Sequence, residues 1–148
     1  MTKDVIISIS GSHIDVAGEL MDGEEDGTIE VITTANYFER DDKRYIFYDE
    51  YAEDSALAIK NRITITGNQM LEIQKAGHLS AHMIFEEGQS NQTYYETPFG
   101  RMLVGVTTLK MEVKEESDYL QVRVAYELDV DNQPFADSQI LIEVNSKQ

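Results

Sequence analysis

The sequence contains no cysteine and no tryptophan, and it has only two prolines in 148 residues. Without cysteine it can form no disulfide, no thiol nucleophile and no thiolate metal site. It has no apolar run approaching the roughly eighteen residues of a membrane-spanning helix. The run from Val5 to Ile9 is too short for a signal peptide. These absences predict a soluble, cytoplasmic protein that does not bind membranes.

Basic residues are also scarce, because 12 lysines and arginines stand against 28 aspartates and glutamates, a net charge of −16. Such a surface repels phosphate backbones, so nucleic-acid binding is not expected. The acidity favours solubility and would suit a basic protein partner. Segment 19–30 holds six acids, no base and two glycines, which predicts a solvated loop.

Two groups of residues partly match metal sites. Segment 22–27 has the acids and the glycine that open a calcium loop, but the twelfth position is Thr33, where a glutamate is required. His78 and His82 would share a strand face, yet Leu79 stands where the zincin motif has glutamate, and no third ligand is evident. We therefore expect no metal and no cofactor.

Apolar and polar residues alternate through most of the chain, which is typical of strands with one buried face. The segments expected as strands are 4–14, 29–40, 44–51, 59–66, 70–75, 79–86, 93–97, 101–113, 119–130 and 140–144. Only 53–58 could hold a helical turn. About nine or ten strands with short turns predict an all-β fold, a single up-and-down antiparallel barrel spanning 1–148 as one domain.

Two strands carry more specific information. Between 44 and 51, Tyr45 and Phe47 alternate with Ile46 and Tyr48, so one face should line the core and the other should meet a neighbour. After Gly100 the apolar residues change from even to odd numbers, and they are Met102, Val104 and Val106, then Leu109, Met111 and Val113. A change of parity within one strand is what a β-bulge produces, so we expect a bulge near 107–109.

Three motifs resemble a known family. They are Met83-Ile84-Phe85-Glu86-Glu87-Gly88, Thr93-Tyr94-Tyr95-Glu96-Thr97-Pro98-Phe99-Gly100 and Tyr126-Glu127-Leu128. In this order they resemble the YwiB-like family of small Firmicute proteins, a domain of unknown function. The resemblance implies a calycin-like β-barrel, related in shape to lipocalins, and it brings no established catalytic or binding residues. The missing tryptophan excludes the Gly-x-Trp signature of true lipocalins.

The interior of such a barrel supplies candidate binding residues. The expected apolar lining is Tyr95, Met102, Val104, Val122, Val124 and Tyr126, with Thr93, Thr97 and Arg123 as polar handles. The competing interpretation is that these side chains simply fill the barrel. Because no catalytic motif occurs, we predict non-enzymatic binding of a small apolar or amphipathic ligand by a monomer or homodimer. The alternative is a filled barrel that acts as a protein-interaction module through its acidic surface. An enzyme ranks third, because a carboxylate pair cannot be recognised from sequence spacing.

Overall fold

The computed structural model describes residues 2–12, 28–51, 58–77, 80–97 and 100–146. These residues form ten strands: β1 (Thr2–Ser12), β2 (Thr28–Arg40), β3 (Lys43–Tyr51), β4 (Ala58–Thr66), β5 (Met70–Ala76), β6 (Ala81–Glu86), β7 (Ser90–Thr97), β8 (Gly100–Glu116), β9 (Tyr119–Val130) and β10 (Gln133–Ser146). Nothing in this part of the chain is a helix long and apolar enough to cross a membrane.

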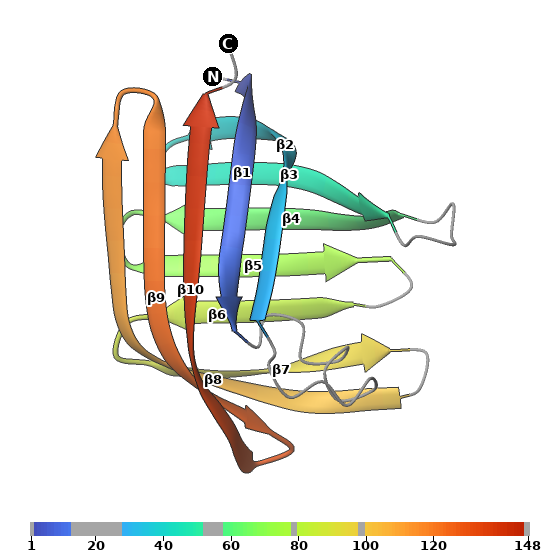
Figure 1. Ribbon diagram of the computed structural model, residues 1–148. Helices are drawn as coiled ribbons and strands as arrows, with labels where there is room; N and C mark the ends of the chain where they lie inside the picture. The colour runs from blue at the N-terminus through green and yellow to red at the C-terminus, as the bar shows by residue number, and fades with distance from the viewer. Residues whose placement is uncertain (1, 13–27, 52–57, 78–79, 98–99, 147–148) are drawn as a thin grey trace.

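The strands form one antiparallel sheet that curls into a nearly closed barrel, which confirms the all-β, up-and-down prediction. Successive strands are hydrogen-bonded neighbours from β1 to β6 and from β7 to β10, and β1 also pairs with β10. In Figure 1, β3 to β6 run across the view while β1 and β10 run upright, so the two sets cross. Buried hydrophobic side chains from both sets form the core.

Some boundaries differ from the sequence-based ones. β2 begins at Thr28, so the last three residues of the expected acidic loop belong to a strand, and Ala58 opens β4 instead of ending a helical turn. The rest of that loop, which includes the calcium-like segment, lies outside the described residues, as do 53–57 and the turn at 98–99. Ladder pairing with β9 extends β10 back to Gln133, well before the expected start at 140.

The sequence predicted that one face of β3 lines the core and that the other meets a neighbour, and the structure shows which face does which. Ile46 and Tyr48 are buried on the core side. Tyr45 and Phe47 lie on the outer face, where the Tyr45 ring centroid is 5.9 Å from that of Phe38 and 6.4 Å from that of Phe47. The neighbour that the outer aromatic residues meet is therefore β2 of the same chain.

The expected β-bulge is confirmed in β8. Its register against β9 shifts between Thr108 and Lys110, which leaves Leu109 without a partner residue. Leu109 was expected to join the inward apolar series, but it is 55% exposed. A bulge inserts one extra residue, so the residue at the bulge leaves the alternation while Met111 resumes it on the core side.

β2 and β3 pair for only part of their length. Their ladder ends at Asn36 and Phe47. Beyond these residues β2 continues along β1 as far as Thr28, while β3 continues along β4 as far as Tyr51. The two strands part because each follows a different one of the two crossing sets.

Candidate functional site

The apolar residues that were predicted from the sequence to line a ligand site lie in the core. Five are buried and the sixth packs against the core: Tyr95, Val104, Val122, Val124 and Tyr126, with Met102. The ring of Tyr126 meets that of Phe85 edge-on, with 4.9 Å between centroids. The nominated side chains point inward, as their alternation predicts, and at this level they pack as a hydrophobic core.

Arg123 does not join these residues. Its side chain is exposed on the outer face of β9, because it alternates with the inward Val122 and Val124. There it borders a cavity of about 320 Å³ together with Lys110 and Glu112, whose ammonium and carboxylate groups are 2.9 Å apart. The placement of Arg123 as a polar handle inside the barrel is therefore wrong.

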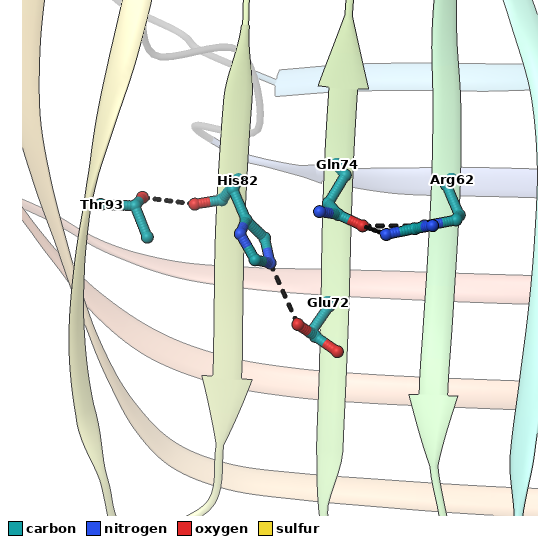
Figure 2. A network of polar contacts seen from close by, with 5 residues as sticks. All are labelled: Arg62, Glu72, Gln74, His82 and Thr93. Carbon is teal, nitrogen blue, oxygen red and sulfur yellow. Dashed lines mark hydrogen bonds and ion pairs between the residues drawn. The ribbon is translucent and has the colours of Figure 1, made fainter.

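Thr93 helps to close the barrel. β6 and β7 form no ladder in the described residues, and an isolated bridge joins their edges through hydrogen bonds of 2.9 and 2.8 Å between the backbones of Ser80 and Glu96. Figure 2 shows a further link across this seam, in which the Thr93 hydroxyl donates to the backbone carbonyl of His82. Thr97 ends β7, and its side chain lies outside the described part of the structure.

Replacing Thr93 by valine is expected to lower the free energy of unfolding by about 1 kcal/mol, because the His82 carbonyl loses its donor while the side-chain shape is kept. Urea denaturation measures this loss, and faster hydrogen exchange at the Ser80 and Glu96 amides, which are hydrogen-bonded across the seam, would report a looser seam. Thr107→Val is the control, since among the described residues its hydroxyl is hydrogen-bonded only to the exposed Ser90 hydroxyl, at 2.8 Å. We expect that control to change stability by less than about 0.5 kcal/mol, and equal losses would contradict the role of Thr93.

Of the two histidines that the sequence placed on one strand face, the structure describes only His82. His82 lies on the outer face of β6, with its Nε2 3.0 Å from Glu72 Oε1, and next to it Arg62 Nε donates to Gln74 Oε1 at 2.8 Å (Figure 2). His78 lies outside the described residues. Among the residues that are described, no three histidine, aspartate or glutamate side chains gather in a way that could hold a metal ion.

A cavity of about 480 Å³ occupies the place where β2 and β3 part. Its lining combines residues from both faces of the wall: outward-facing Asp4, Thr34, Asn36, Phe47 and Asp49, and inward-facing Thr33, Ala35 and Tyr48. Residues of both faces of these two segments therefore border the cavity, which lies in the gap where β2 and β3 part. We call it the β2–β3 cavity.

Beside this cavity, polar side chains interrupt the apolar inner face of three strands. Tyr48 on β3, Asn61 on β4 and Lys75 on β5 occupy directly paired positions, so their side chains lie next to one another on one face. Lys75 Nζ contacts Glu50 Oε1 at 2.6 Å. We call these four residues the inner polar row. Burial, and to a smaller extent the charge of Glu50, raises the pKa of Tyr48 above its usual range, so the hydroxyl remains a neutral donor.

The inner polar row was not predicted from the sequence. The available signal was Asn61 itself, a polar residue that stands between Ile59 and Ile63 in the inward series of β4. The neighbours of Asn61 could not be read in the same way. They depend on the register of β3, β4 and β5, which alternation along one strand does not determine.

A separate, acidic cavity of about 410 Å³ is lined by residues of β1, β2, β8, β9 and β10 and of the β8–β9 turn. Core residues and carboxylates both line it: Val5, Leu120 and Val144, with Glu39, Glu115, Glu116 and Asp118. Arg44 Nε lies 3.0 Å from Glu115 Oε2, and the Tyr37 hydroxyl donates to Glu39 Oε1 at 2.5 Å. Burial, followed by this hydrogen bond, raises the pKa of Tyr37. The carboxylates outnumber their basic partner here.

Comparison with known proteins agrees with this architecture. A family model described as "Domain of unknown function (DUF1934)" matches residues 14–142. The chain is also similar to the crystal structure of the ywiB protein from Bacillus subtilis, with a TM-score of 0.76 and 15% sequence identity over 99% of this chain and 94% of that chain. At that identity the likeness shows a common fold alone. No protein with a curated description matches the chain.

Proposed function

Because the chain belongs to the YwiB-like DUF1934 family, whose function is unknown, its role has to be inferred from its own surfaces, and we propose that it binds a small amphipathic molecule in the β2–β3 cavity. We expect the binding to be non-covalent and without chemical conversion. The observation that carries this proposal is the gathering of exposed hydrophobic side chains around the cavity.

Five large hydrophobic side chains are exposed among the described residues, of which one lines the β2–β3 cavity and two are close neighbours of its lining residue Thr34. Phe47, which is 42% exposed, lines the cavity. Ile6, 39% exposed, is the cross-strand partner of the lining residue Thr34, and Ile32, 65% exposed, lies two residues from Thr34 along β2. Exposed apolar side chains that gather in one place favour a binding surface over random scatter.

Polar groups lie next to this apolar rim. The hydroxyl-bearing residues Thr33 and Tyr48 are among the lining residues, and Tyr48 is the cross-strand partner of Asn61 in the inner polar row. A purely apolar ligand would cover these polar groups without replacing their hydrogen bonds, which is unfavourable. A molecule with an apolar part and a polar end matches both surfaces.

The proposal is tested with Nile red, an uncharged fluorescent probe of apolar sites. Phe47→Ala should weaken probe binding about tenfold, because most of the aromatic contact area at the cavity is lost. Leu109→Ala is the matched control, since it removes another exposed hydrophobic side chain that does not line this cavity, and it should leave the affinity unchanged. Equal losses in both variants, or the absence of saturable binding, would refute the proposed site.

The alternative is an interaction module for a basic protein, and the acidic cavity lined by Glu39, Glu115, Glu116 and Asp118 favours it. The same titrations separate the two functions. A lysine-rich peptide that binds saturably to a protein with no affinity for any amphipath would support this alternative and count against ligand binding in the β2–β3 cavity.

A further inference from the structure

The inner polar row contains one buried group whose hydrogen bonding is incomplete. Asn61 is only 2% exposed. Its Nδ2 donates to the backbone carbonyl of Ile59 at 3.3 Å, while its Oδ1 is buried and has no hydrogen-bond partner among the described residues. Buried side-chain oxygens nearly always accept a hydrogen bond, because leaving one unpaired is costly. Asn61 Oδ1 can therefore accept a hydrogen bond from a donor that the described residues do not supply.

The charges around Asn61 restrict what that donor can be. Lys75 is the cross-strand partner of Asn61, and its ammonium group is paired with Glu50 at 2.6 Å. The two charges cancel, so the inner polar row has no net charge to offer a ligand. A carboxylate or an ammonium head group would bring an unbalanced charge into this largely buried place, which is strongly unfavourable.

Tyr48 supplies the complementary group. It lines the β2–β3 cavity and is the cross-strand partner of Asn61, so a donor and an acceptor are neighbours on the inner face of the sheet, with Tyr48 nearer the cavity. Tyr48 can donate through its hydroxyl, and Asn61 can accept through its carbonyl oxygen. A ligand group that both donates and accepts while remaining neutral would satisfy the two residues together.

We infer that the ligand is an amphipathic molecule with an uncharged, hydrogen-bond-donating end, either an alcohol or a primary amide, whose donor binds Asn61 Oδ1. This inference rests on the proposed binding function and adds the class of the ligand. In this arrangement Tyr48 donates to the oxygen of the head group, and the apolar part of the ligand lies along Phe47 toward Ile6 and Ile32.

The test compares molecules that share one alkyl chain and differ only in the head group. Displacement of Nile red from the wild-type protein at neutral pH is measured with decanol, decanamide, methyl decanoate, decanoate and decylammonium. Decanol and decanamide should each bind at least about tenfold more tightly than any of the other three compounds. Methyl decanoate is the critical comparison, because it is uncharged and accepts hydrogen bonds but cannot donate one to Asn61.

Three variants test the individual residues. Asn61→Leu should abolish the preference for decanol over methyl decanoate, whereas Asn68→Leu, on the exposed β4–β5 turn, should preserve it. Glu50→Gln leaves the charge of Lys75 unpaired and should shift the preference toward decanoate. Lys75→Met leaves Glu50 unpaired and should shift it toward decylammonium. The wild-type ranking decides the inference even if one of these variants does not fold.

The outcomes for the inference and for the proposed function are distinct. If the protein binds neither Nile red nor any of the five compounds, the proposed function fails. If it binds them but prefers decanoate or decylammonium, ligand binding stands and the inference of an uncharged donor is overturned. The same holds if it binds decanol and methyl decanoate with equal affinity. A tenfold preference for decanol and decanamide that Asn61→Leu removes would support both.

Discussion

Phe85→Ala should lower the free energy of unfolding by about 3–5 kcal/mol, the range found when a buried aromatic ring is truncated. Phe85 on β6 is fully buried, and its ring meets that of Tyr126 on β9 edge-on at 4.9 Å. The substitution removes apolar contact area and this aromatic pair, and it leaves a cavity between the two crossing sets of strands. Urea denaturation followed by circular dichroism measures the loss.

Phe47→Ala is the matched control for that experiment, because the same atoms are removed from a ring that is 42% exposed. We expect a loss of no more than about 1 kcal/mol there. Since domains of this kind are stable by only about 5–15 kcal/mol, the Phe85 variant should unfold at a clearly lower urea concentration. Similar midpoints for the two variants would mean that the core is not packed around Phe85 and Tyr126.

Gly11→Ala should destabilise the barrel by about 1–3 kcal/mol, because the new methyl group has no room. A Cβ at Gly11 would lie 2.3 Å from the backbone oxygen of Gln139 and 3.1 Å from the Cα of Ile140. Both atoms belong to β10, and Gly11 is the partner of Ile140 in the ladder that joins the first and last strands. Relief requires β1 and β10 to move apart.

Gly105→Ala provides the control within another strand. A Cβ there would meet the Asp129 side chain at 3.5 Å and that of Gln92 at 3.7 Å, which are ordinary contacts. Alanine also costs less backbone entropy in a strand than glycine, so we expect stability to stay equal or to rise slightly. Thermal unfolding of both variants is the measurement. A Gly11→Ala protein as stable as wild type would exclude the tight approach of β1 to β10.

The sequence by itself determined the class of the fold and most of its strands. Alternation is a local property of an extended chain, because successive side chains point to opposite faces whatever the neighbouring strand is. For this reason the ten strands, the inward face of β9 and the bulge in β8 could all be predicted. The motifs at 83–88, 93–100 and 126–128 also led to the family, which the family match confirms.

Two errors came from departing from that alternation. Arg123 is out of phase with Val122 and Val124, so its exposed position was already contained in the sequence. Leu109 was counted with the apolar residues that follow it, although the residue inserted at a bulge leaves the regular alternation. In both cases the alternation along the strand, followed strictly, would have placed the side chain on the outer face.

Only the tertiary structure decided where a ligand could bind. The β2–β3 cavity exists because β2 follows β1 while β3 follows β4, and the inner polar row exists because Tyr48, Asn61 and Lys75 come into register on three strands. Likewise, the hydroxyl of Thr93 serves the seam between β6 and β7. Register and the parting of strands depend on how the whole sheet twists and closes. The pattern of side chains along one strand does not determine this twist and closure.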